Sequence, residues 1–304
     1  MNKTIPLSQR AFRFNKLALI LMIYLINSSL FACYKVSNCK SACDFGDRNE
    51  LIHQMQNGDF SAVDLLIKNN CSIGDDIIEG VTILHYACEQ NNVALVKTIL
   101  EKNINPDPKS SVRLHTKTPL YIAAVRGEPE IVKLLLDYGA DPNNHDRGII
   151  GYAGTLEIAE ILFSRGAKIN KVIKDGYFGG QLPIHNVSRS KNIDVARFLI
   201  EHGAKINAQD NDGKTPLHIA VSFVNYELIP LYLEHGADPC IRDKDGKTPI
   251  DIALEPIPTK VDPGYIARMK KTRDIITNDS LSERCAPPKG ARPRQKKQST
   301  RTKH

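Results

Sequence analysis

The chain has 304 residues, with 41 Lys and Arg against 34 Asp and Glu, and a formal net charge of +7 at pH 7. A composition of 41% hydrophobic and 25% charged residues is that of a soluble protein and argues against wholesale disorder and against a polytopic membrane protein. The positive charge lies at the ends: residues 1–32 carry +4 and residues 286–304 carry +7, neither with an acidic residue, which leaves residues 33–285 at −4. The folded body is therefore expected to be mildly acidic.

The amino-terminal segment, residues 1–32, is predicted to be a signal peptide. Four cations precede the apolar run Leu17–Ile26, and a helix of this length spans about 15 Å, roughly half of the hydrocarbon core of a bilayer. That length is typical of the apolar region of a signal peptide, so the segment predicts export. The alternative is an uncleaved single-pass membrane anchor over residues 17–32.

The end of this segment, Leu30-Phe31-Ala32-Cys33, resembles the lipobox of bacterial lipoproteins, in which the cysteine is acylated and becomes the new amino terminus. Phe31 departs from that pattern, since a small or β-branched residue is usual there. The resemblance implies a lipid anchor on Cys33 and attachment to a bacterial membrane. Ordinary cleavage nearby would instead give a soluble secreted protein.

A cysteine-containing linker is expected over residues 33–46. Export would place it in an oxidising compartment, where Cys39 and Cys43 lie close enough in sequence to form a disulfide. A metal site formed by Cys33, Cys39 and Cys43 would need a fourth ligand, and none stands at the spacing of a zinc site. No metal is therefore expected.

The middle of the chain is an internal repeat. Three segments align directly: KTPLYIAAVRG from Lys117, KTPLHIAVSFV from Lys214 and KTPIDIAL from Lys247. The positions at which a helix is expected to end have a mean spacing of 33.2 residues and are Asn70, Asn103, Gly139, Gly166, Gly203 and Gly236.

Each repeat is predicted to hold two helices. Thr118 can cap the first helix, and Pro119 takes the first helical position, where its missing N–H costs nothing. The stretch Ile131–Leu136 supplies a wide apolar face for the second helix, which Gly139 can close in a left-handed conformation.

The Thr-Pro-Leu-His-x-Ala start, the Gly-Ala-Asp end and the 33-residue period together resemble the ankyrin repeat. The resemblance covers residues 47–256 and implies an all-α solenoid of about six repeats plus a terminal half-repeat, with short β-hairpin loops along one edge. It also implies that His85, His185 and His218 are structural residues that bond within the array. The repeats are placed at approximately 47–76, 80–109, 116–145, 147–172, 180–209, 213–242 and 246–256.

The tips of two hairpins are the first candidate contact sites for a partner. They are Asp210-Asn211-Asp212-Gly213 and Asp243-Lys244-Asp245-Gly246, which carry turn-forming residues. A calcium loop is the competing interpretation of this Asp spacing, but the remaining ligands and a terminal Glu are missing.

The second candidate contact site follows an irregular repeat. Between Gly139 and Gly166 the repeat is six residues short, and a longer connection follows it that carries Tyr177 and Phe178. These aromatic side chains either anchor a partner or fold back to fill the space that the short repeat leaves.

The carboxy-terminal end is predicted to hold a capping helix within residues 257–285 and a disordered basic tail over residues 286–304. The tail includes Arg292–Lys297, which resembles a short nuclear-import or polyanion-binding patch. The alternative is a solvated tail with no dedicated partner. No aromatic residue lies among its cations, which argues against stacking on single-stranded nucleic acid.

The function expected from these features is that of a monomeric scaffold that binds an unidentified protein partner. No phosphate-binding glycine loop, nucleophile elbow or zinc-binding helix is present, so no catalytic residue and no cofactor is predicted. The alternative function is an electrostatic tether, in which the basic tail binds nucleic acid or an anionic membrane.

Overall fold

The computed structural model describes residues 48–69, 81–108, 118–144, 148–173, 179–256, 262–277 and 285. They fall into two compact parts, an N-terminal part up to Val112 and a C-terminal part from Arg113. Several predicted features lie outside the described residues: the segments 1–32 and 33–46, the cysteines Cys33, Cys39 and Cys43, the aromatic residues Tyr177 and Phe178, and the tail 286–304.

The regular elements are all helical, and the described residues contain no β-strand, which confirms the predicted all-α class. The two hairpins that were predicted at Asp210–Gly213 and Asp243–Gly246 are present as tight turns. The N-terminal part contains α2 (Arg48–Gln56), α3 (Ser61–Lys68), α4 (Ile83–Glu89) and α5 (Val93–Glu101). The C-terminal part contains α6 (Pro119–Arg126), α7 (Pro129–Asp137), the short 3₁₀ helix η1 (Ile149–Tyr152), α8 (Leu156–Ser164), α9 (Pro183–Val187), α10 (Ile193–Glu201), α11 (Pro216–Ser222), α12 (Leu228–Glu234), α13 (Pro249–Ala253) and α14 (Pro263–Ile276).

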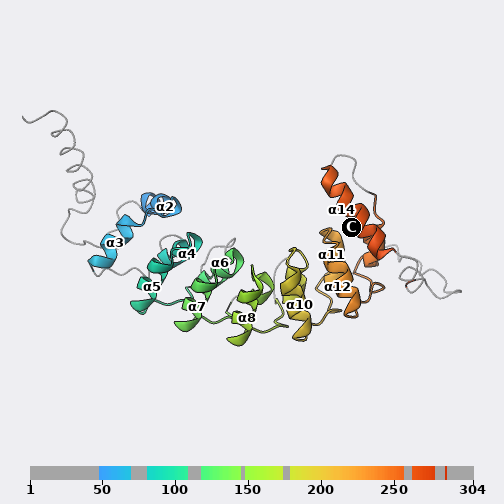
Figure 1. The fold of residues 1–304 in the computed structure, drawn as a ribbon, viewed down its shortest axis with the longest axis horizontal. Coiled ribbons are helices and arrows are strands. Elements are labelled where there is room, and N and C mark those ends of the chain that lie inside the picture. Colours follow the sequence, from blue (N-terminus) through green and yellow to red (C-terminus); the bar gives the residue numbers. More distant parts are fainter. Residues whose placement is uncertain are drawn as a thin grey trace, which may run out of the picture. The chain divides into compact units, whose positions relative to one another are not determined.

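In the C-terminal part the first helices of successive repeats form one row and the second helices form another (Figure 1). The helices α6, η1, α9, α11 and α13 make up the first row, and α7, α8, α10 and α12 make up the second. Apolar side chains of both rows are fully buried, among them Leu120 of α6 and Leu135 of α7. The core therefore lies between the rows and continues from repeat to repeat, so that no repeat buries its apolar face alone.

The helices begin where their capping residues predict. The Thr118 hydroxyl accepts a hydrogen bond from the Tyr121 amide at 3.2 Å, and the Thr248 hydroxyl accepts one from the Asp251 amide at 3.1 Å. Each bond satisfies an amide that the first turn of a helix leaves free. Gly139 ends its repeat in the left-handed conformation, at φ +92°.

The short repeat has η1 in place of a first α-helix. The adjacent repeat comes very close to it, because a Cβ atom at Gly151 would lie 2.4 Å from the Pro183 carbonyl oxygen. The Gly154 amide donates to the Ala124 carbonyl at 2.8 Å and so attaches the short repeat to the end of α6. Gly151 thus lets the adjacent repeat come close enough for the array to continue through a repeat that lacks six residues.

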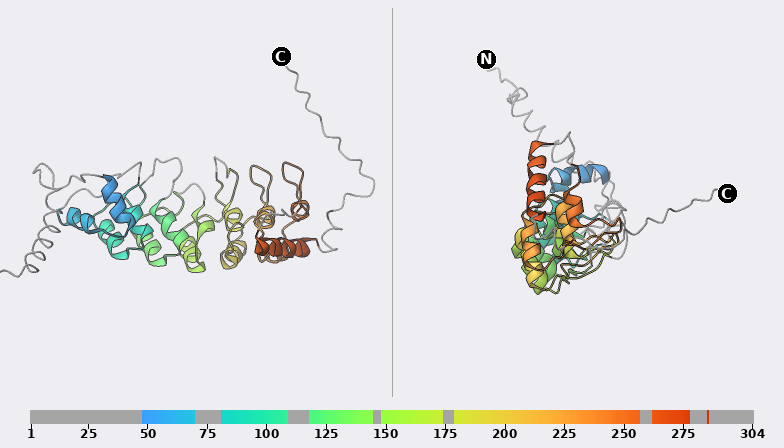
Figure 2. Two further views of the ribbon diagram at one scale, coloured as in Figure 1. Left: turned by 90° about the horizontal axis from the view of Figure 1, so that it is seen from above. Right: turned by 90° about the vertical axis from the view of Figure 1, so that its right-hand side faces the viewer.

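The last helix, α14, packs against α12 and α13. The Arg273 side chain fixes it there by donating to the Ala253 carbonyl at 2.9 Å and to the Glu255 carbonyl at 2.8 Å. The turns that precede α11 and α13 project to one side of the C-terminal part, and α14 lies along the opposite edge (Figure 2). Among the described residues, no helix is long and apolar enough to span a bilayer.

Candidate functional site

The turns before α11 and α13 are each held by a buried aspartate. One Asp210 carboxylate oxygen accepts from the Asp212 and Lys214 amides, both at 2.9 Å, and the other accepts from the Gln181 side chain at 3.0 Å. Asp243 makes the same two bonds to its own turn, from the Asp245 amide at 3.0 Å and the Lys247 amide at 2.9 Å. Both aspartates are only 8% exposed. They therefore stabilise the turns and present no carboxylate for a partner to contact.

The other four residues predicted at the tips are exposed: Asn211, Asp212, Lys244 and Asp245. The two turns also contact each other, because the Lys244 amide donates to the Asp212 carbonyl at 2.9 Å. Successive tips are thus fixed relative to one another. Their exposed polar side chains form a row, and its contact candidates are these four residues.

The histidines of the repeat motif are structural, as the resemblance implied. The Thr215 amide donates to Nδ1 of His218 at 3.1 Å, which requires the neutral ring with its proton on Nε2. That Nε2 lies 3.1 Å from the Lys247 carbonyl and donates to it, across to the next turn. Burial, the largest cause, lowers the pKa of His218 below its ordinary value, although nearby Asp243 and Asp210 oppose the change.

His185 repeats this arrangement one repeat earlier. Its Nδ1 accepts from the Leu182 amide at 3.1 Å, and its Nε2 lies 3.1 Å from the Ala208 carbonyl and 3.2 Å from the Lys214 carbonyl. Burial again lowers the pKa of the ring. Both rings therefore join a helix start to the following repeat and leave no nitrogen for acid–base chemistry.

A series of asparagines links successive repeats just after the carboxyl ends of the second helices. The Asn207 side chain donates to the Gly236 carbonyl at 2.9 Å and accepts from the Asp238 amide at 2.8 Å. The same pair of bonds is made by Asn143 with Gly166 and Lys168, and by Asn170 with Gly203 and Lys205. Each asparagine follows the helix-ending glycine of its own repeat by four residues, so this constant offset was a signal that the sequence analysis missed.

Replacing Asn207 with Ala is expected to lower the free energy of unfolding by about 2 kcal/mol, because it removes two hydrogen bonds to backbone groups of the next repeat. Urea denaturation followed by circular dichroism measures this change. Asn211→Ala is the matched control, since that side chain is exposed at a turn tip and should change stability by less than about 0.5 kcal/mol. Equal effects of the two substitutions would show that the asparagine bonds do not stabilise the array.

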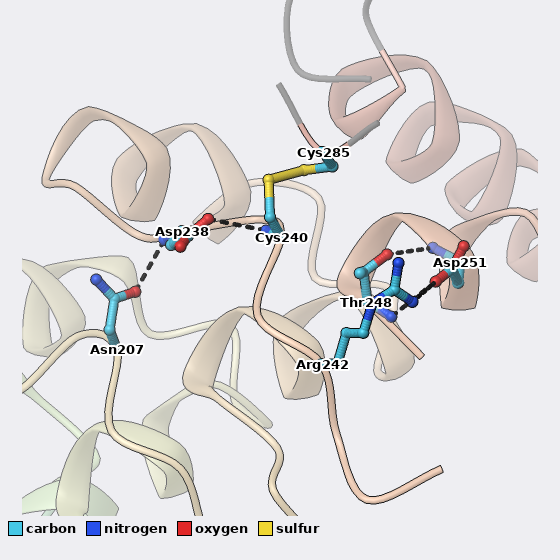
Figure 3. Close-up of a disulfide and its surroundings, with 7 residues drawn as sticks. All are labelled: Asn207, Asp238, Cys240, Arg242, Thr248, Asp251 and Cys285. Carbon is cyan, nitrogen blue, oxygen red and sulfur yellow. Dashed lines mark hydrogen bonds and ion pairs between the residues drawn. A yellow bond between two sulfur atoms is a disulfide. The ribbon is translucent and has the colours of Figure 1, made fainter. Parts of the chain in front are cut away.

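In the last full repeat the same position is occupied by Cys240, four residues after Gly236, and Cys240 forms a disulfide with Cys285 (Figure 3). The described residues contain no further full repeat to which an asparagine here could donate. A covalent bond to the segment that follows α14 takes the place of the asparagine bonds and encloses α13 and α14 in one loop. The sequence analysis did not predict this pairing.

The remaining described cysteine, Cys88, is fully buried in α4 and free. Burial raises the pKa of its thiol, so the reactive thiolate is disfavoured. Among the described residues, no group of three or more His, Cys, Asp or Glu could hold a metal ion.

A family model described as "Ankyrin repeats (3 copies)" matches residues 51–146 and 149–243. The chain is 33% identical over 147 residues to "Putative ankyrin repeat protein FPV222" of Fowlpox virus, a match that covers 46% of this chain and 18% of the relative. It is 36% identical over 105 residues to "Neurogenic locus Notch protein" of Drosophila melanogaster, covering 34% of this chain and 3% of that protein. The chain spans between 18% and 39% of the length of the first three curated relatives. The named relatives are viral and animal proteins and give no support to a bacterial source.

Two solved structures have a similar fold. The human ASB11 ankyrin repeat domain superposes with a TM-score of 0.59 at 24% identity, covering 78% of this chain and 98% of that one. The ankyrin repeat domain of Bcl-3 gives a TM-score of 0.51 at 22% identity, covering 75% and 97% of the two chains. At these identities the likeness establishes the shared fold.

Proposed function

Because the chain belongs to the ankyrin repeat family, we propose that it is a non-enzymatic scaffold that binds a protein partner through the row of first helices and the turn tips. The observation that carries this proposal is the row of exposed tip residues, on turns held by the buried carboxylates of Asp210 and Asp243. Because the turn backbones are already fixed, binding does not have to order them. Ankyrin repeat proteins generally act as protein-binding modules, and this family membership supports the same role here.

Reversing the charge at two tips, with Asp212→Lys and Asp245→Lys in the full chain, is expected to reduce partner capture at least tenfold, about 1.4 kcal/mol of binding free energy. Capture is measured by crosslinking the full chain in lysate of its own source and quantifying the crosslinked proteins by mass spectrometry. The matched control is Glu201→Lys with Glu234→Lys, which makes the same change of charge at exposed positions in the second-helix row. Equal loss with both pairs of substitutions would contradict a role for the tips.

We further propose that the chain is exported, and that it is either anchored by a lipid on Cys33 or secreted. The disulfide between Cys240 and Cys285 supports export, because such bonds persist in oxidising compartments and are rare in reducing ones. The proposal is tested by asking whether these two cysteines are linked in protein taken directly from cells. A disulfide would support export, and free thiols would contradict it. No described residue favours the alternative function of an electrostatic tether.

A further inference from the structure

The helix α14 continues the row of second helices. In that row α7 packs against α8, α8 against α10, and α10 against α12, and α14 is the next helix that packs against α12. It also packs against α13. The disulfide between Cys240 and Cys285 joins the turn after α12 to the segment after α14 (Figure 3). The array therefore holds α14 through the chain that precedes it and through the disulfide that follows it.

The packing of α14 buries few side chains. Of its fourteen residues only Thr272 and Ile276 are buried, whereas α12, with seven residues, has four that are buried. The Thr272 hydroxyl is buried without a hydrogen-bond partner among the described residues, and an unsatisfied polar group opposes docking. Ile276 is thus the one apolar side chain on this helix that is buried.

The polar contacts of α14 lie near the surface. Nζ of Lys271 lies 4.1 Å from the centre of the Tyr226 ring, and Lys271 is exposed. Arg273, which donates to the carbonyls of Ala253 and Glu255, is only half-buried. Water competes for contacts of this kind, so each contributes little net stability. The disulfide is therefore the main attachment of α14 to the array.

The preceding helix, α13, is held without α14. It packs against α11, and its first turn is capped by the Thr248 hydroxyl. The turn before it is fixed to the repeat behind by the bond from the Lys244 amide to the Asp212 carbonyl and by the bond from Nε2 of His218 to the Lys247 carbonyl. None of these bonds involves α14, so they persist when α14 leaves.

The disulfide is accessible to a reductant. Cys240 and Cys285 are both half-buried, in contrast to Cys88, which is fully buried. A thiolate of a dithiol can attack one sulfur of the bridge, so that the S–S bond breaks and the other sulfur leaves as a thiolate and takes up a proton. The second thiol of the reductant then displaces the first cysteine. In all, two electrons and two protons pass to Cys240 and Cys285, and the dithiol becomes a disulfide.

We propose that the bond between Cys240 and Cys285 is a redox latch: its reduction by a dithiol releases α14 from α12 and α13, while the repeats up to α13 stay folded. Release uncovers the Tyr226 ring and the parts of α12 and α13 that α14 covers. The helix is thus docked in an oxidising compartment and free in a reducing one. This inference goes beyond the proposed function, because it adds a control on the C-terminal end that does not involve the turn tips.

Hydrogen exchange followed by mass spectrometry, on the full chain in its oxidised and reduced states, tests the latch. With dithiothreitol the amides of residues 263–276 are expected to exchange at least about tenfold faster, while those of α10, the matched control, change by less than about twofold. The fraction of molecules with fast exchange in α14 should follow the fraction in which Cys240 can be alkylated. The variant Cys240→Ser with Cys285→Ser is expected to show the same fast exchange without reductant.

Two results would overturn the inference, and both come from the unsubstituted protein, so they do not depend on how the double variant folds. Unchanged exchange of residues 263–276 after complete reduction would show that α14 stays docked without its disulfide. Equal acceleration in α10 would show that the disulfide supports the whole C-terminal part and does not control α14 locally.

Discussion

The C-terminal part is expected to lose stability as the pH falls below about 6.5, by up to about 2.7 kcal/mol per pH unit. The loss comes from His185 and His218, whose pKa values are lowered in the folded state. Urea denaturation at pH 7.5, 6.5 and 5.5, followed by circular dichroism, measures the unfolding free energy across this window.

Stability falls as the pH falls because the folded protein holds both rings in one neutral tautomer. In the folded protein Nδ1 of each ring accepts a backbone amide, from Leu182 or Thr215, so a proton on that nitrogen would face another donor. In the unfolded chain both rings titrate near 6.5 and take up protons freely. Below that pH the unfolded state binds more protons than the folded state, so stability is complete above 6.5 and declines toward the lowered folded-state pKa values.

The variant that tests this origin is His185→Gln with His218→Gln, because glutamine has a donor and an acceptor but does not titrate in this range. It is expected to be less stable at pH 7.5, since the ring geometry is lost, and to show a shallower decline between pH 6.5 and 5.5. His235→Gln is the matched control at an exposed position on the second-helix row, and it should leave the decline unchanged. A double variant with the same pH slope as the unsubstituted protein would show that other groups cause the acid sensitivity.

The sequence predicted those features that depend on residues close together in the chain. Thr118, Pro119 and Gly139 define where helices start and stop, and each does so through atoms within a few residues of itself. The periodic apolar positions then require stacking, because a single repeat has no second surface to cover them. The all-α array therefore follows from residues that can be located without knowing the fold.

The features that the sequence analysis missed depend on contacts between repeats. The spacing of Asp210 and Asp243 predicted turns, yet only the structure shows that these carboxylates are turned inward and that Asp212 and Asp245 are turned outward. The close approach of η1 to Pro183 likewise could be seen only in the structure. The asparagine offset after each helix-ending glycine was visible, but its meaning required the carbonyl of the following repeat to be in place.

Reducing the disulfide between Cys240 and Cys285 is expected to lower the stability of the C-terminal end by about 4 kcal/mol, because the bond closes a loop with a sequence separation of 45 and limits the unfolded chain. The loop includes α13 and α14, which are the last two helices that the structure describes and which pack against α11 and α12. In a linear array each repeat is stabilised by its neighbours, so the last repeat depends most on a covalent closure. Urea denaturation with and without dithiothreitol measures the difference.

The variant Cys240→Ser with Cys285→Ser should match the reduced protein and show no further response to dithiothreitol. Cys240→Asn restores the residue found at this position in the preceding repeats, but it should not restore stability, because the part of the chain that the structure describes offers no glycine carbonyl of a following repeat to accept its bond. Recovery in that variant would mean that the position needs an asparagine and not a covalent link. Alkylation of protein taken directly from cells, followed by peptide mapping, should find Cys240 and Cys285 linked, since an exported protein meets an oxidising compartment. Free alkylated thiols at both positions would contradict export as well as covalent closure of the array.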